Sequence, residues 1–97
     1  MARFVRSDDV VVRRVAGELV LVPMVRRSGV SSRPAASFHV LNDTGEFLWG
    51  LLESPVLVED LTDQLADHYE IGAAQAREDV ERFLADLAAC GAIMTLE

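Results

Sequence analysis

Cysteine is nearly missing from this sequence: Cys90 is the only one in 97 residues. A single thiol forms no disulfide within the chain and is too little for a zinc-finger pattern. We therefore expect Cys90 to be a small, half-buried helix residue. A chain without a disulfide framework fits the reducing cytoplasm, which is the location that we expect.

Long apolar runs are missing too. The longest uninterrupted apolar stretch falls far short of the roughly 20 residues that span a bilayer, so we expect no membrane partner. The opening MARFVRSDDV has no apolar stretch followed by a small-residue cleavage site, so we expect no signal peptide. The length and a hydrophobic content of 51% predict one globular domain over residues 1–97, with a thin core.

Lysine is absent altogether, and the nine arginines are unevenly distributed. Seven arginines against three acids give residues 1–37 a net charge of +4, whereas two arginines against thirteen acids give residues 38–97 a net charge of −11. Phosphate binding needs basic residues on the docking face. The acidic half of the chain therefore argues against a nucleic-acid partner.

Catalytic and metal-binding patterns are also lacking. The two histidines, His39 and His68, have no Cys, Asp or Glu at ligand spacing, and we expect both to face solvent. The glycines do not cluster into a phosphate-binding loop, and the acids of the helices are expected to be solvated. The sequence thus predicts no catalytic residue, no metal site and no cofactor. It predicts a binding module and not an enzyme.

The first organised feature is a β-hairpin. Two β-branched, apolar runs, 10–15 and 19–25, flank an Ala-Gly-Glu turn. Residues 26–37 are rich in Ser, Gly, Arg and Pro and predict a mobile loop. Alternation then predicts a short third strand over 38–41.

Three helical patterns follow. Asn42 or Asp43 can cap the first helix, and Trp49 lies off its apolar face, either closing the core or exposed to a partner. The second helix lies between a break at Glu53-Ser54-Pro55 and a second break at Gly72, and the third helix runs from about 73 to 90. Gly91 is the C-terminal glycine of the third helix, and 92–96 can add a terminal strand. The apolar faces are Phe47, Leu48, Leu51 and Leu52; then Val58, Leu61, Leu65 and Tyr69; then Ala76, Val80, Phe83, Leu84 and Leu87.

This order predicts an α+β fold, a three-stranded antiparallel sheet followed by three helices, with a winged helix-turn-helix outline. Two strands of such a sheet are edges with unpaired backbone groups. The third strand, beside a helix with an apolar stripe, would form a groove for an extended peptide. The alternative is an edge covered by the N-terminus, by the loop or by a second copy of the chain.

The segments VVVRRVAGELVLVP, FHVLNDTGEFLWGLLE, EDLTDQLADHYEI and EDVERFLADLAACGAI resemble the PqqD family. This domain is also called the RiPP recognition element, after the ribosomally made, post-translationally modified peptides. The resemblance covers about residues 10–94. Its most specific parts are Leu41-Asn42 with Gly45 and Trp49, the pair Asp79-Val80, and the ending Leu87 to Gly91.

The resemblance implies a module that binds the leader region of a precursor peptide as an added strand and presents the peptide to a modifying enzyme. Radical SAM enzymes and leader proteases are examples of such enzymes, and the sequence does not indicate which enzyme is the partner. Carried over to this chain, the peptide-binding residues are Phe38, His39, Val40 and Leu41 on the third strand. On the third helix they are Asp79, Phe83, Asp86 and Cys90, and the competing flank is Arg77, Glu81 and Ala88.

Two departures from the family pattern stand out. Leu57, which cannot cap a helix, occupies a position where relatives often have Thr, and the loop 26–37 is longer than in the shortest members. Two other functions stay open. One is a winged-helix DNA-binding regulator, and the other is a structural subunit or homodimer in which two edge strands pair. The sequence leaves a monomer and a homodimer equally open.

Overall fold

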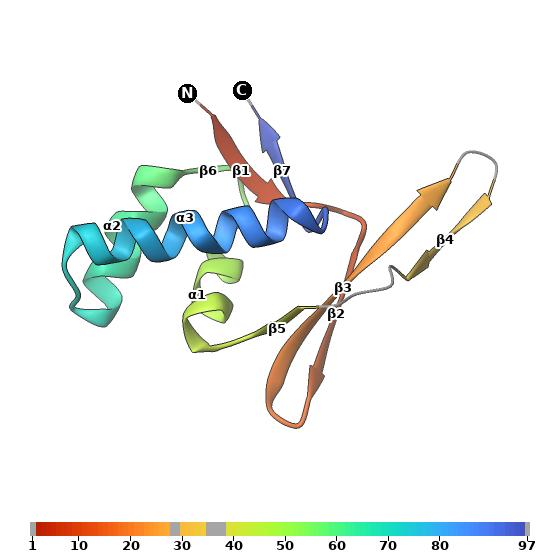
Figure 1. Cartoon of the computed structure of the whole chain (residues 1–97), viewed down its shortest axis with the longest axis horizontal. Coiled ribbons are helices and arrows are strands. Elements are labelled where there is room, and N and C mark those ends of the chain that lie inside the picture. Colours follow the sequence, from red (N-terminus) through yellow and green to blue (C-terminus); the bar gives the residue numbers. More distant parts are fainter. Residues whose placement is uncertain (1, 28–29, 35–38, 97) are drawn as a thin grey trace.

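The computed structural model describes residues 2–27, 30–34 and 39–96. The helices gather at one end of the molecule, and the hairpin of β3 and β4 projects from the other (Figure 1). The elements, in chain order, are β1 (Arg3–Arg6), β2 (Val10–Val15), β3 (Glu18–Arg27), β4 (Val30–Pro34), β5 (His39–Leu41), α1 (Asp43–Leu51), β6 (Val56–Leu57), α2 (Val58–Tyr69), α3 (Ala73–Ala89) and β7 (Ile93–Leu96). The α+β class and the three helices are as predicted.

The predicted hairpin is formed by β2 and β3, which pair from Val10 with Pro23 to Val15 with Glu18. Its turn is Ala16-Gly17, and both residues have positive φ, 52° and 84°. Two central residues with positive φ characterise the type I′ turn, whose twist matches that of the flanking strands. A two-residue connection therefore sets the register of the sheet.

The predicted third strand is β5, which pairs antiparallel with β3 through Leu19 with Leu41, Val20 with Val40, and Leu21 with His39. Leu21 and Leu41 are buried, whereas Val40 on the other face is 48% exposed. His39 shares the face of Leu41 and is half-buried, so the prediction that it faces solvent is wrong. Residue Phe38 lies outside the described residues.

The range predicted as a loop contains strand structure. β3 continues to Arg27, and β4 pairs with it through Met24 with Pro34, Val25 with Arg33, and Arg27 with Val30. The loop prediction is therefore wrong for 26–27 and 30–34, because an edge of β3 beyond the hairpin was available for pairing. Residues 28–29 and 35–38 lie outside the described residues.

A second sheet of three strands, β6-β1-β7, was not predicted apart from its terminal strand. β1 pairs with β7 from Arg3 with Leu96 to Arg6 with Ile93, so the described N- and C-terminal strands lie side by side (Figure 1). The backbone N–H groups of Arg6 and Ser7 donate to the carbonyl oxygens of Leu52 and Ala92. These bonds join the small sheet to the end of α1 and to the segment after α3.

The helix ends follow the local sequence. Asn42 is the N-cap of α1, and its Oδ1 accepts a hydrogen bond from the Gly45 N–H at 2.8 Å. Leu57 stands at the N-cap of α2 with no side-chain hydrogen bond, as expected. After α3, Gly91 has φ 79°, and the N–H groups of Gly91 and Ala92 donate to Ala88 and Leu87. This pair of bonds is a Schellman ending.

The core lies between the helices and the inner face of the β2-β3-β5 sheet. Trp49 is only 4% exposed, so it closes the core and is not presented to a partner. The predicted stripes supply most of the buried side chains, which are Leu21, Leu41, Leu48, Trp49, Leu52, Leu61, Leu65, Ala76, Val80, Leu84, Leu87, Ala92 and Ile93.

Candidate functional site

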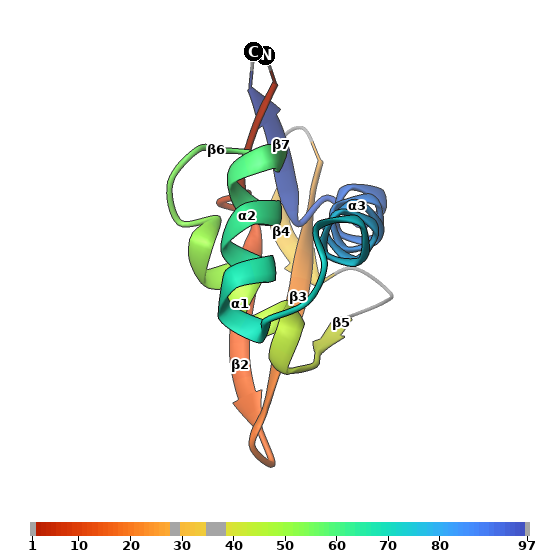
Figure 2. The ribbon, with the colours of Figure 1, turned by 90° about the vertical axis from the view of Figure 1, so that its left-hand side faces the viewer.

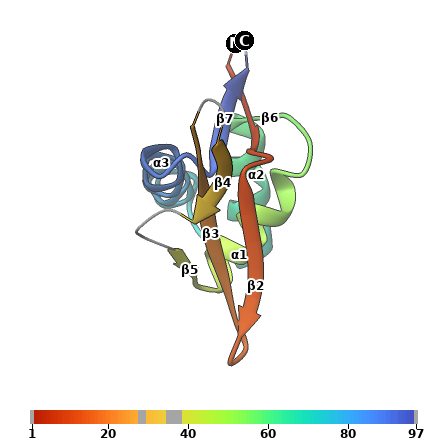
Figure 3. The ribbon, with the colours of Figure 1, turned by 90° about the vertical axis from the view of Figure 1, so that its right-hand side faces the viewer.

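The free edge of β5 is the first component of the site. Among the described residues, β5 pairs only with β3. Figures 2 and 3 show β5 on the side of β3 opposite to β2, toward α3. One backbone edge of β5 therefore faces α3 without a strand partner in the described part of the chain.

Val40 carries the backbone groups of this edge. The Met24 N–H donates to the Asp9 carbonyl oxygen, so even-numbered residues of β3 direct their N–H groups toward β2. Because backbone groups alternate along a strand, Leu19 and Leu21 bond to β5, opposite Leu41 and His39. The N–H and C=O of Val40 then point away from β3, toward the free edge.

A groove runs between this edge and α3. It consists of two adjoining cavities of about 240 and 180 Å³, which share Asn42, Gly45, Phe83 and Asp86 as lining residues. We call it the β5–α3 groove. The larger cavity is also lined by Thr44, Leu48, Asp79 and Arg82, and the smaller one by His39, Val40, Leu41 and Leu87.

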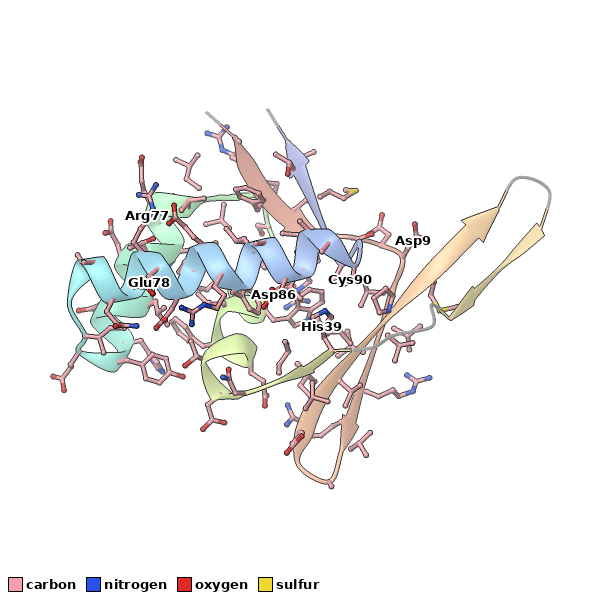
Figure 4. All side chains as sticks on the ribbon, viewed as in Figure 1. Asp9, His39, Arg77, Glu78, Asp86 and Cys90 are labelled. Carbon is pink, nitrogen blue, oxygen red and sulfur yellow. The ribbon has the colours of Figure 1, made fainter. Side chains whose placement is uncertain are left out.

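Six of the eight residues predicted to bind peptide line this groove: His39, Val40, Leu41, Asp79, Phe83 and Asp86. Figure 4 shows Asp86 and His39 in the space between α3 and β5, with Arg77 above α3, away from the groove. None of the competing flank, Arg77, Glu81 and Ala88, lines the two cavities. Of the other two, Phe38 lies outside the described residues, and Cys90 is treated next.

Cys90, assigned to the same flank, does not line either cavity. It is half-buried, as expected for a small helix residue, and its Sγ lies 3.4 Å from the Leu87 carbonyl oxygen. The thiol therefore belongs to the end of α3 and not to the groove.

The first turn of α1 also lines the groove, and the sequence did not predict this contribution. Asn42, Thr44 and Gly45 line it, and Arg82 joins them from α3. A Cβ atom on Gly45 would stand 3.2 Å from Cβ of Leu41, tighter than ordinary packing. Glycine thus lets α1 begin directly against β5. The spacing of Leu41, Asn42 and Gly45 was visible in the sequence, but the position of these residues beside α3 was not.

An ion pair connects β2 to α1 near the end of β5. Arg14 on β2 and Glu46 on α1 are 2.7 Å apart, and Arg14 also donates to the Gly17 carbonyl oxygen at 2.9 Å. The hydrogen bond and the attraction of Glu46 raise the pKa of Arg14 above its ordinary value. The pair links the hairpin turn to the helix that follows β5.

His68 lies apart from the groove. It is exposed, and its ring stacks on Phe47 with centroids 4.1 Å apart, which joins α1 to α2. The described residues contain no group of three or more His, Cys, Asp or Glu side chains placed to hold a metal ion. Within the same residues, no helix is long and apolar enough to cross a membrane.

A family model matches most of the chain. The family model described as "Coenzyme PQQ synthesis protein D (PqqD)" matches residues 18–93. This chain belongs to the PqqD family. The matched range of this PqqD-family protein begins at β3 and includes β5 and all three helices, so it contains both walls of the groove.

One solved structure resembles the chain over almost its whole length. It is described as TbiB1 in complex with the TbiA(beta) leader peptide, and it is 25% identical with a TM-score of 0.69. The match covers 92% of this chain and 93% of that one. No curated protein matches the sequence. The comparison shows that this PqqD-family chain has the fold of TbiB1.

Proposed function

We propose that this protein is a non-catalytic module that binds the leader region of a ribosomally made precursor peptide. The leader adds a strand to the free edge of β5 and lies in the β5–α3 groove. The observation that carries this proposal is the backbone of Val40, which faces the groove with no strand partner among the described residues.

Strand addition suits this geometry. Main-chain hydrogen bonds to an exposed edge supply affinity, and pockets beside the edge read alternate side chains of the peptide. The groove offers both, since Val40 lies on the edge and the cavities extend along α3. The complex of TbiB1 with a leader peptide, in a chain of the same fold, supports a leader peptide as the ligand.

We further propose that the bound peptide is presented to a separate modifying enzyme, such as a radical SAM enzyme or a leader protease, in the cytoplasm. An added strand occupies only the short length of β5, three residues. The rest of a precursor peptide would extend beyond the groove and stay accessible to such an enzyme.

The test is an amide NMR titration with the leader segment of a precursor peptide encoded beside this gene. We expect shifts at 39–45 and 79–87, and a Val40→Pro variant that binds at least about tenfold more weakly, since it removes the N–H on the free edge. Val12→Pro is the matched control, because alternation places its N–H on the opposite free edge, that of β2. Equal binding by the two proline variants would disprove the groove assignment.

A homodimer in which two β5 edges pair with each other uses the same free edge and is the second candidate. Sedimentation velocity separates the two proposals, because a peptide-binding monomer keeps its mass at all concentrations, whereas the dimer dissociates on Val40→Pro substitution.

A DNA-binding regulator is disfavoured by the charges of α3. Both of its arginines are in ion pairs, Arg77 with Glu81 and Arg82 with Glu78, each at 3.1 Å. The helix has no uncompensated cation to offer a phosphate.

A further inference from the structure

The α3 wall of the groove carries two carboxylates separated by an aromatic ring. Asp79 and Asp86 are seven residues apart, so they lie on the same side of the helix with about 10 Å between them along its axis. Phe83 lies between them, and all three line the groove. A peptide in the groove would therefore pass both carboxylates.

Neither carboxylate forms an ion pair among the described residues. Asp79 accepts a hydrogen bond from the amide of Gln75 at 2.9 Å, and an amide brings no charge. Asp86 has no ion-pair partner among the described residues. Arg82, the cation on this wall, is 3.1 Å from Glu78, which does not line the groove. The wall of the groove therefore carries two carboxylates against one arginine, which pairs with neither of them.

A third cavity that Val40 lines is acidic as well. A third cavity, of about 320 Å³, is lined by Glu18, Asp43 and Glu46 together with Gly17, Val40, Leu41 and Asn42. Glu46 is paired with Arg14, but no ion pair involves Glu18 or Asp43 within the described residues. Carboxylates without an ion-pair partner among the described residues therefore line both cavities that Val40 borders, Asp86 in one and Glu18 and Asp43 in the other.

We propose that the groove selects its peptide by positive charge, with Asp79 and Asp86 as the specificity-determining residues. The inference rests on the proposed function and adds the chemistry of the ligand: an extended peptide with Lys or Arg side chains beside α3. Side chains on one face of a strand repeat at about 7 Å, so two basic residues two or four positions apart reach both carboxylates with their flexible stems.

A random dodecapeptide library displayed on mRNA provides the test, since it does not require the sequence of the natural leader. Selection is run against the wild type, the double variant Asp79→Asn/Asp86→Asn and the control Asp63→Asn/Asp67→Asn. The control makes the same change of charge on exposed residues of α2, away from the groove. Peptides are kept only if Val40→Pro weakens their binding, so that every retained peptide reports on the strand edge.

We expect Lys and Arg to be enriched among peptides that bind the wild type and the control, and not among those that bind the Asp79→Asn/Asp86→Asn variant. For one such peptide, that variant should raise Kd about tenfold at low salt, and less at high salt where exposed charges are screened. An Asp86→Lys variant should shift the enrichment toward Glu and Asp.

Two results would overturn the inference in distinguishable ways. Retained peptides without any enrichment of basic residues would refute the charge selection and leave strand addition standing. A selection that yields no peptide sensitive to Val40→Pro would refute both the charge selection and the proposed function.

Discussion

The guanidinium of Arg6 lies over the indole ring of Trp49, 4.9 Å from the ring centroid, and its Nε donates a hydrogen bond of 2.9 Å to the Trp49 carbonyl oxygen. That carbonyl belongs to the last turn of α1, which has no basic residue of its own. Arg6 therefore supplies the cation that favours a helix C-terminus, from a strand 43 positions away in sequence. The contact joins the β6-β1-β7 sheet to the helix that positions the groove.

Replacing Arg6 should destabilise the protein. Arg6→Ala removes a cation–π contact and a charge-assisted hydrogen bond, so we expect a loss of about 2 kcal/mol in the free energy of unfolding. Arg6→Lys should recover less than half of that loss, because the ammonium cannot both stack flat and donate as the guanidinium does. Urea unfolding followed by circular dichroism measures the effect. The control is Arg3→Ala, an exposed position on the same strand, and a loss no larger than that of the control would contradict the prediction.

Substitution of one residue in the hairpin turn should raise the stability of the protein. Ala16 has φ 52°, a left-handed conformation that costs an L-residue roughly 1 kcal/mol, whereas glycine adopts it freely. Ala16→Gly should therefore stabilise the protein by about 0.5–1 kcal/mol, and Gly17→Ala should destabilise it by about 1 kcal/mol. For a domain of this size, 1 kcal/mol corresponds to a change in Tm of about 4–8 °C. Calorimetry that finds the two variants changing Tm in the same direction would refute the assignment of the turn.

The cap of α1 should matter for both stability and binding. Asn42→Ala leaves the Gly45 N–H without its acceptor and should cost about 1 kcal/mol in the free energy of unfolding. Because Asn42 also lines the groove, leader affinity should fall with it. Asn42→Asp keeps an acceptor oxygen and should retain the stability of the wild type. Chemical denaturation and a peptide titration on the same samples separate the two effects, and a stable Asn42→Ala variant would rule out the capping role.

Phe83 should contribute more to binding than to folding. Its ring is half-buried and lines both cavities of the groove, so Phe83→Ala should cost only about 1–2 kcal/mol of stability, less than a fully buried aromatic residue. We expect the affinity for a leader peptide to fall roughly tenfold or more.

Phe47→Ala provides the comparison for Phe83. Phe47 is also half-buried and aromatic, but it stacks on His68 outside the groove, so its loss should lower stability and leave affinity unchanged. Calorimetric titration of both variants with the same peptide measures this difference. Equal peptide affinities of Phe83→Ala and Phe47→Ala would argue against a peptide contact by Phe83.

Local features of the fold could be read from the sequence alone. These features are a cap at Asn42 or Asp43, the missing cap at Leu57, the ending at Gly91 and the apolar stripe of α3, and each depends on residues within a few positions of each other. The structure decided for Asn42 as the cap. Helical periodicity also reduced the groove wall to two flanks of α3. We expected the flank with Asp79, Phe83 and Asp86, but periodicity alone does not exclude the other flank, since both adjoin the stripe.

Pairing between distant segments could not be read in this way. β1 and β6 are short, and β4 has the composition of a loop, so each becomes a strand only because another strand offers it an edge. The face of the sheet on which the His39 side chain lies depended on the register of β5 against β3. The sequence determined, through local periodicity and caps, which segments are helices and which residues are apolar. Tertiary structure alone decided that Asp79, Phe83 and Asp86 face β5, because that choice depends on where a strand some 40 residues earlier in the chain packs.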